Sequence, residues 1–442
     1  MTDKLLIYTP KMTNRLGYTL NVVFRYILKM EYQLTVSREA MEQYEGPKIS
    51  YGPERIGDSL FIKAARLLTE TTISEQELRP LTYDGQRAFF PVYGGESDFP
   101  FDPLASSFYL LSRYEEYLPH LTDEHGRFKA VESVQYKEGM LAYPMVDRWA
   151  LAIRDKIAQK YPSMKIAERK YEFVQTVDID SAYCYKNKGI GRGLMGLMRD
   201  ISARDTAAVK RRMRVITGKE KDPYDTFEYI LEQRKKYRQG HLIFFVLLGD
   251  YGVYDKPISY LSSEFRELLK HVGDYAKMGI HPSYESLSHP QLIDKEMKRL
   301  SDIIHRPIVR SRFHFLRLQL PESYRALIHA GIKHDYTMGY AEEPGYRAGT
   351  ATPYPFFDLL RDSETELLIH PFVTMDTTFR RYKEKTPDEA IEELGKMIEE
   401  ARKVGGRFCC IVHNQNIGDI DGWGEWKRVY EAMMEMADPS KK

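Results

Sequence analysis

The sequence predicts an α/β protein, with a parallel sheet in its C-terminal part and a smaller α/β unit before it. Three observations support this prediction. From residue 171 onward, short apolar runs alternate with segments of helical periodicity, as in strand–helix repeats. Residues 244–248 read Phe-Phe-Val-Leu-Leu, which is expected of a strand covered on both faces. The length of 442 residues, 43% of them hydrophobic, suits two packed domains.

The composition excludes several classes of protein. Lys plus Arg number 65 against 64 Asp plus Glu, so there is no basic excess of the kind that nucleic-acid binding requires. Three cysteines are too few for a disulfide framework or a thiolate metal site. The N-terminus lacks a signal-peptide pattern, and no apolar run approaches the roughly 18 residues of a membrane span. We therefore expect a cytoplasmic protein without a transmembrane segment.

Residues 1–165 are expected to form an N-terminal α/β domain, whose role the sequence does not reveal. Residues 5–8 predict a first strand and residues 16–30 an amphipathic helix. A second helix is predicted after Asp102-Pro103, because Asp caps helices and Pro suits the first turn. On this second helix we expect ordinary surface or domain-contact ion pairs, from Arg113, Glu115 and Glu116.

Residues 170–442 are expected to form the larger domain. Its strands are predicted in seven apolar runs, at 173–180, 241–250, 277–283, 308–316, 332–340, 367–373 and 407–414. Helices are predicted between several of them, at 260–276, 290–304 and 387–404. A segment rich in Arg and Lys, residues 192–221, interrupts the interval between the first two strands. We favour a solvated helical insertion there, with peripheral contact to membrane headgroups or to an anionic substrate as the alternative.

Polar side chains stand at the C-terminal ends of all seven runs. In a closed parallel barrel these ends gather around one mouth, which is where such folds place their active sites. The ends read Asp178-Ile-Asp180, Gly249-Asp250, His281-Pro-Ser283, Arg312-Phe-His314, His334-Asp335, His370-Pro371 and His413-Asn414. We therefore expect one site built from several strands.

Asp178 and Asp180 share one face of the first strand, because alternate residues of a strand point the same way. Two carboxylates on an apolar strand are costly unless a cation or hydrogen-bond donors compensate them. The acids could instead cap the segment that follows the strand. Together with His281, however, they suit a hydrolytic divalent metal such as zinc, which activates water for attack on a carbonyl.

Four segments resemble the motifs of the polysaccharide deacetylase superfamily, carbohydrate esterase family four. They are Thr176-Val-Asp178-Ile-Asp180, Gly279-Ile-His281-Pro-Ser-Tyr-Glu285, Ser311-Arg312-Phe-His314 and the strand from Gly406 to His413. The resemblance covers residues 170–442 and implies a distorted seven-stranded β/α barrel. With its extra N-terminal α/β domain, the chain also resembles a divergent bacterial subgroup of these enzymes. It departs from the family in the spacing of its two acids and in Glu285, which replaces a metal-binding His.

The resemblance implies a role for each matching residue. Asp178 would be the catalytic base and Asp180 a metal ligand, although the two roles could be exchanged. His281 would be the second ligand. Arg312 would hold the base as a charged carboxylate, and His413 would protonate the leaving amine.

Three side chains compete to be the third metal ligand, namely His314, Glu285 and His289. We favour His314, because a strand holds a side chain more rigidly than the loop at 282–289 does. The expected cofactor is a divalent metal, zinc with nickel or cobalt as alternatives.

Three further features of the larger domain bear on the predicted site and barrel. The loop at 343–350 carries Arg347, either in a simple connecting turn or as an arginine that orients substrate or base. Asp376 is expected to orient a ligand or His413. Cys409 and Cys410 are expected to be buried, one facing the barrel interior and the other the helices.

The sequence thus predicts a metal-dependent hydrolase that removes an acyl group, usually acetyl, from an N-acylated sugar or glycan precursor. The bond broken would be a linear amide C–N bond. One alternative is a catalytically inactive barrel that serves as a binding or assembly module in surface-glycan synthesis, and the missing second His favours it. Another keeps the metal but hydrolyses a non-sugar amide.

Overall fold

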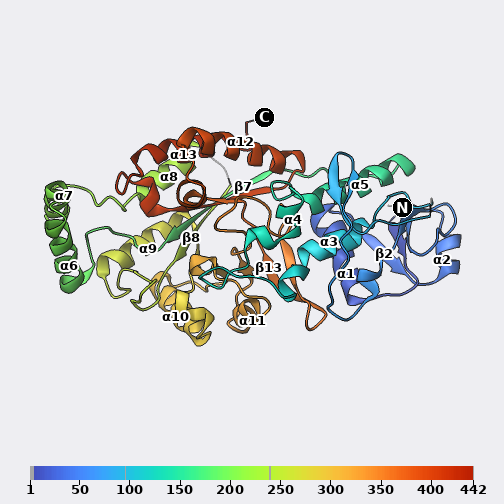
Figure 1. The fold of residues 1–442 in the computed structure, drawn as a ribbon, viewed down its shortest axis with the longest axis horizontal. Helices are drawn as coiled ribbons and strands as arrows, with labels where there is room; N and C mark the ends of the chain where they lie inside the picture. Colours follow the sequence, from blue (N-terminus) through green and yellow to red (C-terminus); the bar gives the residue numbers. More distant parts are fainter. Residues whose placement is uncertain (1–3, 95, 238–239, 442) are drawn as a thin grey trace.

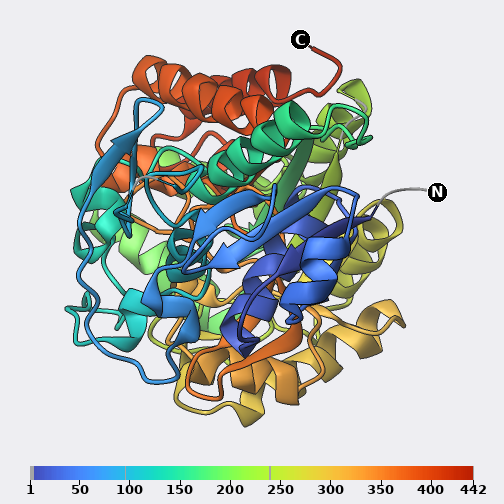
Figure 2. The ribbon, with the colours of Figure 1, turned by 90° about the vertical axis from the view of Figure 1, so that its right-hand side faces the viewer.

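The computed structural model describes residues 4–94, 96–237 and 240–441. Residues 1–3, the start of the N-terminal stretch that lacks a signal-peptide pattern, lie outside the described residues. The fold is α/β with parallel sheets, as the sequence predicts. The N-terminal part forms one end of the long axis and the C-terminal part forms the rest (Figure 1). Viewed along that axis, the N-terminal sheet lies in front of the larger part (Figure 2).

The N-terminal sheet has four parallel strands in the order β2-β1-β3-β4. Their bounds are β1 Leu5–Tyr8, β2 Tyr32–Thr35, β3 Lys48–Gly52 and β4 Leu60–Lys63. A small hairpin, β5 Leu81–Tyr83 and β6 Gln86–Ala88, follows. The helices of this part are α1 Asn14–Leu20, α2 Arg38–Gln43, α3 Pro103–Leu111, α4 Val134–Lys137 and α5 Met145–Lys160. The predicted first strand is β1, and the predicted helix at 16–30 is α1 with a π-helical continuation to Ile27.

Helix α3 begins where the sequence predicts. The Asp102 carboxylate accepts hydrogen bonds from the backbone N–H groups of Leu104 and Ala105, each at 2.9 Å, and so caps the helix. The helix ends earlier than expected, because Arg113 takes a left-handed conformation with φ of 53°. Glu115 and Glu116 therefore lie in a separate short 3-10 helix, Tyr114–Tyr117.

The large sheet has nine strands in the order β12-β13-β11-β10-β9-β8-β7-β15-β14. Their bounds are β7 Glu172–Ile179, β8 His241–Val246, β9 Lys277–Ile280, β10 Arg310–Ser311, β11 His334–Asp335, β12 Tyr354–Asp358, β13 Ser363–Ile369, β14 Thr374–Met375 and β15 Arg407–His413. All pairs are parallel except β12 with β13. Each of the seven predicted runs overlaps a strand, and β12 and β14 were not predicted. The register of β15 on β7 sets His413 opposite Asp178.

The outermost parallel strands at the two ends of the sheet, β13 and β14, are close together in the sequence. Strand β13 pairs with β11. After a gap of four residues, β14 pairs with β15. Between them the N–H of Phe372 donates to Met338 O at 3.0 Å, and the N–H of Val373 donates to Cys409 O at 2.8 Å. The strands enclose a separate apolar cluster, formed by Val174, Ile243, Phe245, Leu316, Tyr336, Ala341, Phe372, Met375, Cys409 and Ile411.

Along the chain, the remaining helices each come after a strand of the large sheet. Their bounds are α6 Gly189–Ser202, α7 Thr206–Ile216, α8 Phe227–Lys236, α9 Ser263–Tyr275, α10 Gln291–Ile304, α11 Glu322–His329, α12 Pro387–Lys403 and α13 Lys427–Met436. The helices predicted at 260–276, 290–304 and 387–404 are α9, α10 and α12, so these three predictions are confirmed. Within the described ranges, no helix has both the length and the apolar character that a bilayer crossing needs.

Cys409 and Cys410 lie side by side in β15 with both side chains fully buried. Cys409 belongs to the enclosed apolar cluster, whereas Cys410 packs in the outer core with the helices. The predicted division between the two faces of the strand is therefore confirmed.

Candidate metal centre at the strand ends

The residues predicted to form the site come together at the carboxyl ends of four strands. Asp178 lies in β7, and Asp180 directly follows it. His281 directly follows β9, and Arg312 and His314 come just after β10. His413 is the last residue of β15. Five of them line one cavity of about 190 Å³, and Arg312 lies behind Asp178. The other lining residues are Arg127, Phe315, Leu316, Met375, Thr377, Arg381, Tyr382 and Gln415.

Asp180, His281 and His314 present three donor atoms to one point. One donor atom from each side chain lies within 4.8 Å of the other two. Asp180 Oδ1 is 3.4 Å from His281 Nε2 and 3.7 Å from His314 Nε2. This oxygen is buried and has no hydrogen-bond partner among the described residues. A buried, unpartnered carboxylate oxygen beside two imidazole nitrogens fits a divalent cation.

Each of the two histidines is held by its other ring nitrogen. His281 Nδ1 lies 2.6 Å from the carbonyl oxygen of Arg312, and His314 Nδ1 lies 2.7 Å from Asp255 Oδ1. Because a carbonyl oxygen can only accept, Nδ1 of His281 carries a proton, and Nε2, on the Asp180 side, is the ring nitrogen that could bind a metal. Partners on the far nitrogen are the usual way in which proteins orient metal-binding histidines.

Asp178 is engaged on one side only. The Arg312 guanidinium donates from Nη1 to Asp178 Oδ1 at 2.8 Å, and from Nε to the carbonyl oxygen of Tyr336 at 3.0 Å. The other carboxylate oxygen, Oδ2, lies 3.8 Å from His281 Nε2 on the cavity side. Arg312 is fully buried and also lies over the Phe245 ring, 4.6 Å from its centroid.

His413 is fixed by Asp376, which follows β14. Asp376 Oδ1 lies 2.8 Å from His413 Nδ1, and Asp376 Oδ2 accepts from the backbone N–H of His413 at 2.8 Å. Burial alone would lower the pKa of His413, but the Asp376 carboxylate raises that pKa to about 10. His413 Nε2 is left facing the cavity, 3.8 Å from Asp180 Oδ2.

The charges around the centre shift one another's ionisation. Burial alone would raise the pKa of Asp180, but the surrounding rings of His281, His314 and His413 hold it well below its usual value. Burial alone would lower the pKa of His281, but the carboxylates of Asp178 and Asp180 raise it. These directions favour charged carboxylates at the site.

Several site residues were not predicted from the sequence. Asp255, in the loop after β8, accepts from the N–H of Tyr284 at 3.0 Å as well as contacting His314. Arg127 comes from the N-terminal part and donates to the carbonyl oxygen of Phe315 at 2.9 Å, beside His314. Phe315 has a left-handed backbone, with φ of 57°. Asp255 lies nine residues beyond β8, so it carries no strand-end signal, and nothing local in the sequence marks Arg127 either.

Other predicted residues lie elsewhere. Glu285 and His289, the rival third ligands, are exposed and outside the group that surrounds Asp180. Asp250 is also away from the cavity and pairs with Lys295 and Arg299 of α10.

The expectation that all seven strand ends meet at the mouth is wrong for three of them, namely Gly249-Asp250, His334-Asp335 and His370-Pro371. His334 Nδ1 lies 3.0 Å from His370 Nε2, and Arg407 at the start of β15 donates to His370 Nδ1 at 2.9 Å. His370 therefore lies at the level where β15 begins. The reason is that the chain stays extended beyond Ile369 and forms β14 before it reaches the mouth.

Arg347 is also outside the cavity. Its guanidinium donates to both carboxylate oxygens of Glu116, at 2.9 and 2.7 Å. Arg113 donates to the same carboxylate at 2.7 Å. The three side chains are buried between the N-terminal part and the large sheet. The ion pairs of Arg113 and Glu116 are thus buried, and Glu116 links the N-terminal part to Arg347 of the C-terminal part, so the surface interpretation is wrong.

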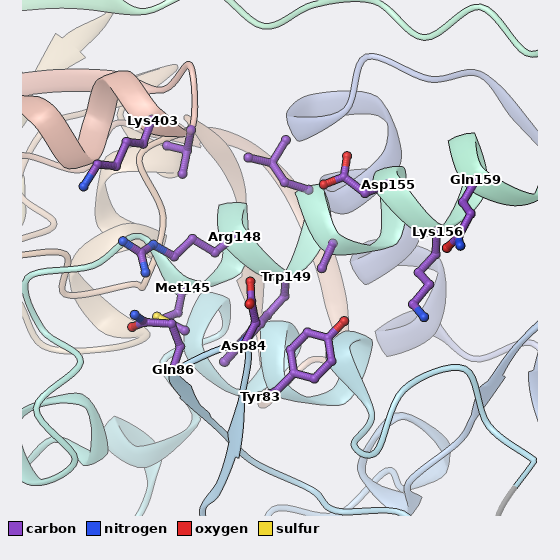
Figure 3. A pocket seen from close by; sticks show the side chains of 13 residues that line it. Tyr83, Asp84, Gln86, Met145, Arg148, Trp149, Asp155, Lys156, Gln159 and Lys403 are labelled. Carbon is purple, nitrogen blue, oxygen red and sulfur yellow. The ribbon is translucent and has the colours of Figure 1, made fainter. Parts of the chain in front are cut away.

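A second hollow, of about 400 Å³, lies between the β5–β6 hairpin, α5 and the end of α12 (Figure 3). Arg148 and Lys403 in its wall both pair with Glu400. Among the described residues, the donor group at Asp180 has no counterpart in this hollow. The strand-end cavity is therefore the better candidate site.

Known proteins and families are similar to parts of this chain. A family model, "Family of unknown function (DUF7033)", matches residues 5–162. The chain matches none of the curated proteins. A solved structure of a putative polysaccharide deacetylase from Mycobacterium smegmatis is 15% identical, with a TM-score of 0.39, over 62% of this chain and 86% of that chain.

Two further solved structures are similar to this chain. A polysaccharide deacetylase from Bacillus cereus is 11% identical, with a TM-score of 0.31, over 61% of this chain and 86% of that one. A mutant of a CE4-family pseudoenzyme with restored activity is 10% identical, with a TM-score of 0.28, over 60% of this chain and 63% of that one. At TM-scores below 0.5 these likenesses establish no activity for this chain.

Proposed function

We propose that this protein is a metal-dependent hydrolase that removes an acetyl or other acyl group from the nitrogen of a sugar in a glycan or glycan precursor. One observation carries the proposal. A buried carboxylate oxygen of Asp180, without a hydrogen-bond partner among the described residues, lies between the Nε2 atoms of His281 and His314. Leaving such an atom unpaired is costly unless a cation binds there.

The fold proposed with this function is a distorted seven-stranded barrel, formed by residues 170–442 after an N-terminal domain of residues 1–165. The continuous segment from β13 to β14 supports closure, because it pairs with β11 at one end and with β15 at the other. The enclosed apolar cluster would be the barrel interior.

Asp180, His281 and His314 would hold a divalent ion, with zinc favoured and nickel or cobalt as alternatives. When bound, the ion would supply Lewis acidity to the amide carbonyl and to the attacking water. Asp178 would accept the proton from that water through Oδ2, since Oδ1 is occupied by Arg312. The Arg312 ion pair would hold this carboxylate in place.

His413 would donate a proton to the leaving nitrogen. Its Nδ1 is held by Asp376, so Nε2 is the atom directed into the cavity. Amide hydrolysis needs this proton because an amine, not its anion, must leave. Asp376 is a positioning residue in this scheme, since it acts through His413.

The catalytically inactive binding module remains the alternative. Its main support was the Glu at position 285, where the family has a metal-binding His. His314 places a second imidazole beside Asp180, so three donors are present without Glu285. We therefore rank the hydrolase first.

Release of acetate from oligomers of N-acetylglucosamine, with zinc supplied, tests the proposal. The wild type should release acetate, and Asp178→Asn should slow the reaction by about 10²- to 10⁴-fold. Glu285→Gln, an exposed neighbour outside the donor group, is the matched control and should leave the rate unchanged.

Absence of hydrolysis with zinc, nickel and cobalt, on sugar and non-sugar amides alike, would contradict the hydrolase and favour the binding module. Hydrolysis of non-sugar amides alone would retain the mechanism and replace the substrate class.

A further inference from the structure

Helices α6 and α7 form a hairpin that leaves the barrel directly after the strand carrying Asp178. They occupy the end of the molecule opposite the N-terminal sheet (Figure 1). Helix α6 packs against α7, where Arg212 donates to Asp200 Oδ2 at 2.6 Å. An added Cβ at Gly191 or Gly193 would meet no atom within 4 Å. These two positions of α6 therefore face open space.

The exposed side of α6 is apolar. Its residues recur at intervals of four, four and three positions, so they share one face of the helix. They are Ile190, Leu194, Met198 and Ile201, with 93%, 54%, 61% and 57% of their surface exposed. Met213 and Ile216 of α7 are also exposed. Helices α6 and α7 run antiparallel, and the Arg212–Asp200 contact marks the faces with which they meet. On helical wheels set by that contact, the apolar residues of α6 and those of α7 lie on the same side of the hairpin.

The hairpin is also strongly basic. Residues 188–221 contain ten Lys or Arg and three Asp or Glu, a net charge of +7 in a chain whose total is +1. Lys210 and Lys219 are exposed, and no acidic side chain pairs with either among the described residues. Long cationic side chains beside an apolar face are typical of helices that lie in a membrane interface.

The exposed apolar surface continues toward the mouth of the barrel. Arg192 of α6 donates to the carbonyl oxygen of Pro257 at 3.0 Å and lies over the Tyr251 ring. In the same loop Val253 is 80% exposed, and Asp255 holds His314. The hairpin is thus linked through one loop to the candidate metal centre.

We propose that the α6–α7 hairpin docks on an anionic bilayer surface, with its apolar side at the boundary between headgroups and acyl chains. The combination of apolar and positive surface favours this occupant. If the occupant were a second copy of the hairpin, two segments that each carry a net charge of +7 would repel each other. Docking would bring the cavity close to the membrane surface, where a lipid-linked substrate could reach it. The docking itself does not depend on the proposed hydrolysis.

Flotation of the full-length protein with vesicles tests the proposal. The wild type should float with vesicles that contain phosphatidylglycerol, bind phosphatidylcholine vesicles more weakly, and lose affinity as salt is raised. The double variant Leu194→Glu, Met198→Glu should bind at least about tenfold more weakly, because charge cannot enter the acyl boundary. The double variant Lys210→Gln, Lys219→Gln should lose roughly fivefold for each cation removed.

The matched control is Val36→Glu, Leu121→Glu, which adds the same charges at exposed apolar residues of the N-terminal part and should bind like the wild type. Circular dichroism should show every variant folded, and hydrolysis of a soluble substrate should be unchanged in all of them. Failure of the wild type to float with either vesicle at low salt would overturn the proposal. So would a lipid-free dimer that Leu194→Glu, Met198→Glu dissolves, because the face would then be a self-interface.

Discussion

Two buried clusters of charge differ in one respect. Where Arg347 meets the N-terminal part, each of its guanidinium nitrogens donates to Glu116 or to a backbone carbonyl, and those of Arg113 donate to Glu116, Glu115 or a backbone carbonyl. At the strand ends, Asp180 Oδ1 has no hydrogen-bond partner among the described residues and faces a cavity. Both clusters are buried, but only the second leaves room for a ligand.

This difference separates a structural ion pair from a candidate site. A buried charge that is fully paired needs nothing further, and removing one partner exposes the cost of burying the other. A buried charge with an open position is costly as it stands and is stabilised by whatever binds there. Arg347 and Asp178, one from each cluster, are buried to a similar extent, so burial alone does not distinguish the two roles.

Glu116→Gln breaks the paired cluster and should have the largest effect on stability. Two buried guanidinium groups would lose their carboxylate, so the free energy of unfolding should fall by about 3–5 kcal/mol in urea denaturation. The control Glu366→Gln removes an exposed pair with Lys333 and should cost less than about 1 kcal/mol. Metal content should stay unchanged in both. An equal effect of the two substitutions would show that the paired cluster is not an energetic centre.

The same cluster should make stability fall in acid. Burial alone would raise the pKa of Glu116, but Arg347 and Arg113 lower it to about 2 from the ordinary 4.5. Because the folded pKa is depressed, this contribution is complete above pH 4.5 and is lost as the pH falls through about 2. The difference amounts to about 3 kcal/mol. Urea denaturation across this range should show a steeper loss in the wild type than in Glu116→Gln, and parallel curves would contradict it.

At the candidate centre, Asp376→Asn should reduce turnover by about 10- to 100-fold without loss of metal, since it removes the carboxylate that orients His413. The effect should appear in kcat and leave KM unchanged, because Asp376 is expected to act through a proton transfer. Asp250→Asn, at a strand end outside the cavity, should be silent. A change in KM alone would assign Asp376 to substrate binding instead.

The smallest effects are expected from the rival third ligands. Glu285→Gln and His289→Gln should each leave metal content as in the wild type, because both side chains are exposed and outside the donor group. Elemental mass spectrometry of the purified variants measures this. Loss of metal in either variant would mean that the loop after β9 closes over the centre when the ion binds.

The convergence of four of the seven strand ends could be predicted from the sequence, because parallel strands end on the same side of a sheet. Asp178, His281, His314 and His413 converge for that reason alone. The sequence also predicted how the two cysteines of β15 are oriented, because the alternation of side chains along a strand assigns Cys409 and Cys410 to opposite faces.

Other features depend on tertiary contacts that no local pattern contains. Arg127 reaches the site only because the N-terminal part packs over the mouth, and its neighbours in sequence give no sign of this. His370 was misplaced because the chain remains extended from β13 into β14. Arg347 was a candidate for substrate binding because its partner, Glu116, is distant in sequence.

The most direct test is the metal content of the purified protein, measured by elemental mass spectrometry beside the double variant Asp180→Ala, His281→Ala and the single variant His314→Ala. We expect near-stoichiometric zinc, nickel or cobalt in the wild type, none in the double variant and a marked loss in His314→Ala. A wild type that stays empty after incubation with all three metals would contradict the metal centre, and so would a double variant that keeps its ion.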